Sequence, residues 1–380
     1  MPDDIAVDDP IVGIPSDDVG IEPEEILGTD TIRDPFDPTV IRIDSKAPTI
    51  AQLMERIGHG EIDLMPDFQR QGGLWNDKAQ SRLVESLLIR IPLPAFYMDG
   101  TNEDRWLVVD GLQRLTSLKR FILDRELRLS GMEFLQHLNG KAYDELPRNL
   151  QRRISETPVN VYLIETGTPP EVKFNIFKRI NTGNLPLSPQ EIRHALNQGR
   201  STRLLAELAH TVEFKAATAG SVRSDRMADR EFVLRFLAFA LSSYADYNAR
   251  DFDAFLNHAM QQINGMSEAE IDNLRERFLR AMRISCTLLG KGAFRKSSIA
   301  GRQMPINKAL YEAWSVNLEA LTDGQVAVLY HRRDQIESEN RKLLGSDDFT
   351  NAISQGTGDV NKVKLRFSQV HEALARVLQC

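Results

Sequence analysis

Four residues in the stretch VVDGLQRLTSL, residues 108–118, could do chemistry together: Asp110, Gly111, Gln113 and Arg114. They stand where an apolar strand runs into a helix, and the amide hydrogens and dipole of a helix N-terminus favour phosphate. Gly111 would let the backbone approach a ligand closely, and the Arg114 guanidinium matches phosphate oxygens. Asp110 could hold a metal ion or orient a water molecule. Because turns use Asp-Gly constantly, local physics alone favours an ordinary turn here, with a phosphate site as the alternative.

A second Gln-Arg pair, Gln69 and Arg70, lies in MPDFQRQGGLWNDKAQ, residues 65–80. The pair precedes a Gly-Gly turn, and its recurrence is typical of a site that draws on two segments. A plain surface loop is the alternative. Trp75 stands just before Asn76, the expected helix cap, and we expect Trp75 to anchor the loop in the core.

A third polar stretch, FKRINTGNLPLS, covers residues 177–188. Arg179 lies near the end of an expected helix, and Asn181, Thr182 and Gly183 follow it as a loop. Backbone amides in such a loop can cradle an anion. The bare sequence favours a helix C-terminal cap followed by a turn, with the anion cradle as the alternative.

Basic residues gather at 277–311, which contains eight Lys or Arg and no Asp or Glu. A solvated helix face normally mixes both signs, so the run favours a surface that contacts a phosphate backbone. A second basic group follows the glycine turn of GTGDVNKVKLRF, residues 356–367. The predicted DNA contacts are Lys291, Arg295, Lys296, Arg302, Lys362, Lys364 and Arg366.

Hydrophobic spacing predicts the elements that position these residues. Ser188 and Glu191 form a capping box, and Gly199 is placed to end the helix that they begin. After residue 200 strand signals fade and helical spacing takes over. The sequence therefore predicts an α+β protein, with a small mixed-sheet domain over residues 38–200 and an all-α helical domain over 201–380. Strands are expected at 39–44, 95–98, 105–110 and 159–165, and helices at 49–60, 76–90, from 113, at 170–181 and at 188–199.

The charge is divided unevenly along the 380 residues, whose net charge is −7. Residues 1–32 hold ten acidic residues and no Lys or Arg, which leaves 44 acidic against 47 basic residues in the remainder, a net +3. We expect residues 1–37 to be a disordered acidic tail that keeps the protein soluble. Mimicry of nucleic acid against a basic groove is the alternative.

Several classes of protein are disfavoured by what the sequence lacks. Two distant cysteines, Cys286 and Cys380, exclude a disulfide scaffold and suit a reducing cytoplasm, where we expect the protein. No apolar run is long enough for a membrane span, and the acidic start is unlike a signal peptide. The chain has no Walker-type loop, no dinucleotide fingerprint and no His-Asn-His nuclease pattern.

Three blocks in a fixed order resemble one known family. PDFQR…W precedes a helix and IPLP, VVDGLQRLTSL follows, and FKRINTGNLPLSPQEIRHAL comes last. Together they resemble the N-terminal domain family of GmrSD-type restriction enzymes, known by an Asp-Gly-Gln-Gln-Arg motif on a ParB/sulfiredoxin-like core. The resemblance covers about residues 45–200. It implies that residues 38–200 form a ParB/sulfiredoxin-like nucleotide-binding domain and that the helical domain contacts DNA or a partner.

The resemblance also implies a role for each motif residue. Asp110, Gln113 and Arg114 would be catalytic, and Asp110 would bind Mg²⁺ that accompanies a nucleoside triphosphate. The motif's first glutamine is Leu112 here. Leucine can neither position water nor bind phosphate, so this departure bears on hydrolysis more than on binding. Phosphate binding is expected from Gln69, Arg70, Gly111, Arg179, Asn181, Thr182 and Gly183.

The leading hypothesis is a component that binds and hydrolyses NTP in the anti-phage restriction of DNA. Whether the target DNA carries a chemical modification is left open. The resemblance implies a His-Asn-His nuclease, either joined to such a domain or acting as its partner. This sequence shows no His-Asn-His pattern, so the nuclease is expected as a separate partner, with a homo-oligomer left open. Two other functions are kept: a non-catalytic DNA-binding regulator with a ParB-like fold, and an autonomous metal-dependent DNA nuclease.

Overall fold

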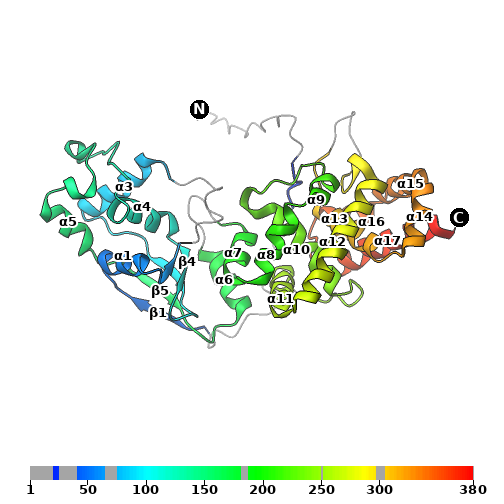
Figure 1. Ribbon diagram of the computed structural model, residues 1–380, viewed down its shortest axis with the longest axis horizontal. Helices are drawn as coiled ribbons and strands as arrows, with labels where there is room; N and C mark the ends of the chain where they lie inside the picture. The colour runs from blue at the N-terminus through cyan, green and yellow to red at the C-terminus, as the bar shows by residue number, and fades with distance from the viewer. Residues whose placement is uncertain are drawn as a thin grey trace, which may run out of the picture.

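The computed structural model describes residues 20–24, 41–64, 75–180, 187–249, 251–296 and 304–379. A small sheet comes first along the chain, and a helical region follows it (Figure 1). In Figure 1 the sheet and its helices lie to the left and the helical region to the right. The predicted α+β class is therefore confirmed, while the domain limits and the ParB/sulfiredoxin-like fold stay predictions.

The sheet has five strands in the order β1-β5-β3-β4-β2. β3 and β4 form the expected antiparallel hairpin, and β5 pairs with β3 in parallel. Alternation along β3 buries Phe96 and Met98 on one face, while Tyr97 lies half-buried on the other. The strand expected at 39–44 is found further along, as β1, and residues 39 and 40 lie outside the described part. The strands are β1 Ile43–Lys46, β2 Ile62–Asp63, β3 Phe96–Asp99, β4 Trp106–Asp110 and β5 Val161–Ile164.

Four helices share one hydrophobic core with the inward side chains of the sheet. Thr49 makes a capping box at the start of α1, and the Asn76 side chain caps α3. Trp75 packs against this core, half-buried, as expected of an anchor. The helices are α1 Ile50–Gly58, α3 Asp77–Leu88, α4 Leu112–Ile122 and α5 Arg148–Ser155, with short 3₁₀ turns η2 Gln136–Leu138 and η3 Tyr143–Glu145.

Two further helices, α6 (Pro170–Ile180) and α7 (Pro189–Leu196), pack with Val109 of β4 in a second, smaller core. The capping box that begins at Ser188 is present as predicted. Gly199 does not end that helix, because α7 stops at residue 196 and Gly199 is the N-cap of the next helix. The expected helix end was therefore misplaced by a few residues.

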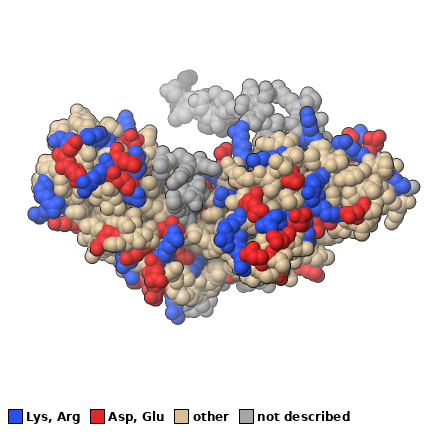
Figure 2. Space-filling model, viewed as in Figure 1, with Lys and Arg blue, Asp and Glu red and all other residues tan. Residues whose placement is uncertain are grey.

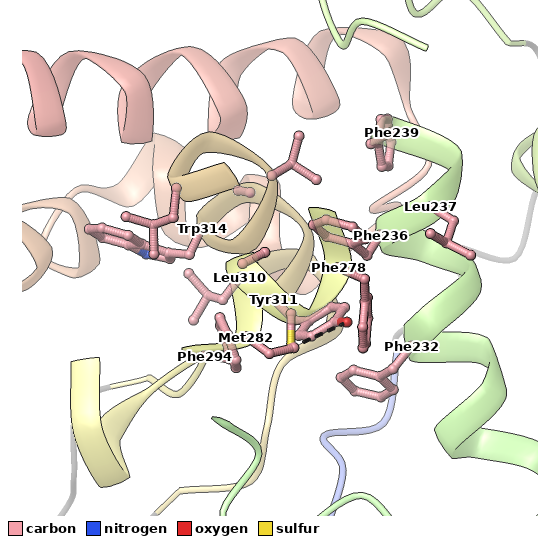
Figure 3. Close-up of a cluster of buried hydrophobic side chains, with 14 of the residues drawn as sticks. Phe232, Phe236, Leu237, Phe239, Phe278, Met282, Phe294, Leu310, Tyr311 and Trp314 are labelled. Atoms are coloured by element: carbon pink, nitrogen blue, oxygen red, sulfur yellow. Dashed lines mark hydrogen bonds between the residues drawn. The ribbon is translucent and has the colours of Figure 1, made fainter. Parts of the chain in front are cut away.

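The helical region is built around α13, whose residues from Ala309 to Leu318 are all buried. Tyr311 of this helix contacts Phe232 and Phe294 edge-to-face, and these rings fill the centre of the region (Figure 3). The helices are α8 Arg200–Ala209, α9 Val212–Ala217, α10 Ala228–Leu241, α11 Phe252–Gly265, α12 Glu268–Leu289, α13 Lys308–Glu319, α14 Asp323–His331, α15 Arg333–Leu344, α16 Asp347–Ser354 and α17 Val360–Gln379, with 3₁₀ turns η4 Asp225–Met227 and η5 Gly290–Gly292.

Asp253 of α11 links the two parts of the molecule. Its carboxylate accepts hydrogen bonds from Arg193 of α7 at 2.6 Å and from Lys178 of α6 at 3.0 Å. Burial would raise the pKa of Asp253, but these two positive charges outweigh it and hold the pKa below its usual value. Charge pairing therefore fastens the helices beside the sheet to the helical region.

A short piece of the N-terminal segment, residues 20–24, lies against the helical region. Ile21 forms a parallel bridge with Ile306, and the Glu22 backbone N–H donates to the Ile306 carbonyl at 2.9 Å. The expectation of disorder for residues 1–37 is therefore wrong for these five residues, and the rest of that range lies outside the described part.

A buried ion-pair network crosses the helical core. Glu312 of α13 is fully buried and accepts from Arg366 of α17 at 2.6 Å and from Arg235 of α10 at 2.7 Å. Arg366 pairs with this carboxylate inside the core, whereas Arg235 is also paired with Glu231. Removal of the Glu312 charge is costly because a buried charge without its partner is strongly unfavourable.

Glu312→Gln should therefore lower the free energy of unfolding by about 3–5 kcal/mol, since two buried guanidinium groups lose a charged partner. Urea titration followed by far-UV circular dichroism measures the loss. Glu207→Gln is the matched control, because its ion pair with Arg275 is much more exposed and should contribute less than about 1 kcal/mol. Equal losses for the two variants would contradict the account.

Candidate functional site

The turn from β4 into α4 brings Asp110 and Gly111 to the end of a buried strand. Gly111 has a φ of +97°, and a Cβ placed on it would lie 2.3 Å from a ring carbon of Phe96. Both the backbone conformation and the lack of space call for glycine here. The turn therefore approaches β3 more closely than any side chain at this position would allow.

Arg114 is the partner of Asp110. Its Nη2 donates to the Asp110 carboxylate at 2.8 Å and to the Ala95 carbonyl at 3.2 Å, and its Nη1 donates to the Pro94 carbonyl. The guanidinium carbon lies 4.6 Å from the centre of the Phe96 ring. Because Arg114 is only 9% exposed, it holds the site together from inside, which differs from the phosphate fork expected from sequence. Its carbonyl partners are the last residue of the IPLP block and the residue that follows it, a role that sequence reasoning missed.

Asp110 is half-buried at the edge of this arrangement. Burial raises its pKa, and the positive charge of Arg114 together with hydrogen bonds from Gly111 and Arg114 counters part of that rise. A carboxylate with a raised pKa accepts a proton more readily than an ordinary aspartate. Asp110 is therefore more basic than an exposed aspartate.

Gln113 ties α4 to the segment that precedes α3. Its side-chain Oε1 accepts from the Trp75 backbone N–H at 3.2 Å. The Trp75 carbonyl in turn accepts from Gln80 of α3, and Arg120 of α4 donates to the Gln80 Oε1 at 2.9 Å. These contacts place the end of the second polar stretch beside the first.

The first turn of α4 has no side-chain cap among the described residues, since its N-cap is Gly111. The first intrahelical bond runs from the Leu115 N–H to the Gly111 carbonyl, so the amides of residues 112–114 precede the helical hydrogen-bond ladder. By contrast, α1, α3 and α7 are capped by side chains. An uncapped N-terminus with the helix dipole behind it is suited to an anion.

Leu112, the departure from the family motif, is 5% exposed and belongs to the main core of the sheet region. Its side chain thus packs inward from the start of α4. The residue at this position contributes to packing.

The third polar stretch begins close to the same strand. Phe177 of α6 shares a small core with Val109, the residue before Asp110. Leu187, the first described residue after α6, packs against the same core. Arg179 is exposed near the end of α6. The predictions for Gln69, Arg70, Asn181, Thr182 and Gly183 fall outside the described residues.

Comparison with protein families decides what this arrangement is related to. Residues 50–197 match the family model described as GmrSD restriction endonuclease, N-terminal domain. The match runs from the start of α1 through α7 and includes the β4–α4 turn. The resemblance inferred from three sequence blocks is thereby confirmed over this segment. No curated protein matches the chain.

Two of the DNA contacts predicted outside the matched segment need correction. Arg366 has no exposed surface and is bonded to Glu312 and to the Thr357 carbonyl. Arg295 is 3% exposed and donates to the Ser221 hydroxyl at 2.6 Å and to the Met304 carbonyl. Both guanidinium groups face internal partners, so they hold the helical region together and are not placed to contact DNA.

The remaining predicted DNA contacts differ in their surroundings. Lys362 donates to Asn351 and to the Gln355 carbonyl. Lys296 bonds to Glu22 and Ser354, while Lys291 is exposed and Lys364 half-buried. On the face in Figure 2, basic and acidic side chains are interspersed over the helical region. DNA contact by these four lysines stays a prediction, and Arg302 lies outside the described residues.

Two general findings complete the site. In the described ranges no three His, Cys, Asp or Glu side chains are grouped so as to hold a metal ion. Within the same ranges no helix combines the length and apolar character needed to cross a membrane. A metal at Asp110 stays a prediction.

Gly111→Ala should destabilise the protein more than Gly140→Ala, a glycine with a φ of +85° and open space around its missing side chain. The control carries only the backbone cost of about 1 kcal/mol or more, whereas the alanine at 111 also collides with Phe96, which adds about 1–3 kcal/mol. Thermal or urea unfolding measures both variants. Equal destabilisation would show that the close approach to β3 is unimportant.

Proposed function

We propose that the chain is an NTP-binding and NTP-hydrolysing component of a GmrSD-like DNA restriction system in anti-phage defence, acting with a separate nuclease. The match of residues 50–197 to the N-terminal domain of GmrSD restriction endonucleases supports the restriction part of the proposal. As part of the same proposal, residues 38–200 form a ParB/sulfiredoxin-like nucleotide-binding domain.

The observation that carries the nucleotide part is the uncapped first turn of α4 with Asp110 directly before its glycine N-cap. The amides of residues 112–114 would bind a terminal phosphate, which adds its negative charge at the positive end of the helix dipole. Asp110 stands beside that position with a raised pKa, suited to orient or deprotonate the attacking water.

The other motif residues then have defined roles. Arg114 positions Asp110 through their ion pair and fixes the turn to β3. Because the Gln113 Oε1 is bonded to Trp75, the contact of Gln113 with water or phosphate falls to its Nε2. Asp110 fits Mg²⁺ as a single carboxylate ligand, since Mg²⁺ in such sites takes most of its ligands from phosphates and water. When bound, Mg²⁺ would neutralise charge on the phosphates.

Two observations favour a second candidate, a DNA-binding regulator that binds nucleotide without hydrolysing it. Leu112 is directed into the core, and Arg114 is engaged by carbonyls and Asp110. Both reduce the number of polar groups that face a transition state. Binding and phosphate release must therefore be measured separately.

Asp110→Asn should retain nucleotide binding and lower phosphate release by about 10²–10³-fold, because the amide keeps the shape of the carboxylate and loses its basicity. The matched control is Asp124→Asn, whose carboxylate is also ion-paired and has 29% exposure against 28% for Asp110. Purified full chain is assayed with DNA present, by equilibrium dialysis for binding and by phosphate release for turnover.

Unchanged turnover in Asp110→Asn would refute the assignment of Asp110. Nucleotide binding without turnover in the unaltered protein would favour the regulator instead. Loss of nucleotide binding in both variants would point to a site elsewhere in the chain.

A further inference from the structure

The strongest unexplained feature lies outside the GmrSD match, where Glu22 and Glu24 dock on the helical region. The Arg235 guanidinium donates two hydrogen bonds to the Glu24 carboxylate, of 3.0 and 2.7 Å. Lys308 adds a contact at 3.2 Å, and the Thr357 hydroxyl donates at 2.8 Å. Glu24 thus accepts four hydrogen bonds from one guanidinium, one ammonium and one hydroxyl, which together form a specific anion-binding site.

Glu22 occupies a neighbouring position. Its carboxylate accepts hydrogen bonds from the Lys296 ammonium at 2.6 Å and from the Asn307 side-chain amide at 3.1 Å. Asn307 is the N-cap of α13, and Lys308 begins that helix, so both carboxylates meet the positive end of a helix dipole. Pro23 between the two glutamates favours an extended backbone, which presents them as two successive anions along one strand.

The charges of the cluster balance only with these two carboxylates in place. Arg235, Arg366, Lys296 and Lys308 bring four positive charges, and Glu231 and Glu312 bring two negative ones. Without the docked segment the cluster carries a net +2, much of it shielded from water. Burial would raise the pKa of Glu24, but the charges of Arg235 and Lys308 lower it to about 2.

The inner part of the cluster is rigid and the outer part is accessible. Arg235 is 5% exposed and its position is fixed by Glu231 and Glu312, independently of the docked segment. Lys296 and Lys308 retain 23% and 16% exposure even with the segment in place. The cluster is therefore preformed, reaches solvent and lacks two negative charges when Glu22 and Glu24 leave. An anionic ligand can bind there in place of residues 20–24.

From this geometry we infer that the Arg235–Lys296–Lys308 cluster is a nucleic-acid phosphate site, which Glu22 and Glu24 occupy in cis as stand-ins for two successive phosphates. The bidentate guanidinium, the two ammonium groups and the helix N-terminus are the donors that phosphodiesters use. The inference rests on the DNA-binding part of the proposed function and is independent of nucleotide hydrolysis. The docked segment and DNA compete for the same donors.

DNA binding by the full chain tests the competition. Glu22→Gln together with Glu24→Gln should raise the affinity for a fluorescently labelled DNA duplex about tenfold, because a tethered competitor is weakened. The slope of log K against log salt should steepen by roughly 0.9 for each phosphate gained. Fluorescence anisotropy without nucleotide gives both quantities.

The control pair is Asp347→Asn with Asp348→Asn, exposed residues at the start of α16 that change the net charge by the same amount. This pair should leave both affinity and salt slope close to those of the unaltered protein. Adding Lys296→Gln to the Glu22 and Glu24 substitutions should remove part of the gain, since it deletes one phosphate donor.

Three results would overturn the inference. Equal gains in DNA affinity for the two acid-to-amide pairs would mean that the affinity depends only on the net charge of the protein. A lower melting temperature of the Glu22 and Glu24 variant with unchanged DNA affinity would mean that residues 20–24 only stabilise the helical region. Absence of DNA binding in every variant would also reject it, whereas the nucleotide assay on Asp110 would still decide the proposed hydrolysis.

Discussion

The guanidinium of Arg114 fastens β3, β4 and α4 to one another, and the geometry of the candidate site follows from that attachment. It reaches the Asp110 carboxylate at the end of β4, the carbonyls just before β3, and the face of the Phe96 ring. For this side chain to fit beneath the turn, the backbone must pass directly over Phe96, which only Gly111 permits. A glycine N-cap then leaves the first amides of α4 without a side-chain cap. One buried arginine thus creates both a positioned carboxylate and an open helix N-terminus.

Anion recognition recurs in the helical region by different means. There the donors are side chains around a buried guanidinium, and two glutamates of the N-terminal segment satisfy them. The site at α4 relies on backbone amides, which suit a terminal phosphate, whereas the cluster around Arg235 suits a phosphodiester chain. The proposed nucleotide site and the proposed nucleic-acid site lie on different elements, so each can be altered without the other.

Local signals in the sequence predicted the elements well, because caps and hydrophobic spacing act over a few residues. The capping box at Ser188, the Asn76 cap and the β3–β4 hairpin are examples. Long-range partners could not be predicted in this way. Arg366 was assigned to a DNA surface because its spacing matched nearby lysines, yet its partner Glu312 lies 54 residues away. The internal engagement of Arg114 was missed for the same reason, since its carbonyl partners belong to another block.

Hydrogen–deuterium exchange of the full chain, with and without a nucleoside triphosphate and Mg²⁺, tests the central claim most directly. The account predicts that nucleotide slows exchange of the amides in residues 112–114, which precede the hydrogen-bond ladder of α4 in the free protein. Peptides from α12, within the helical core, should be unchanged. Nucleotide-dependent protection confined to other segments, with residues 112–114 exchanging as before, would contradict the assignment of this turn as the phosphate site.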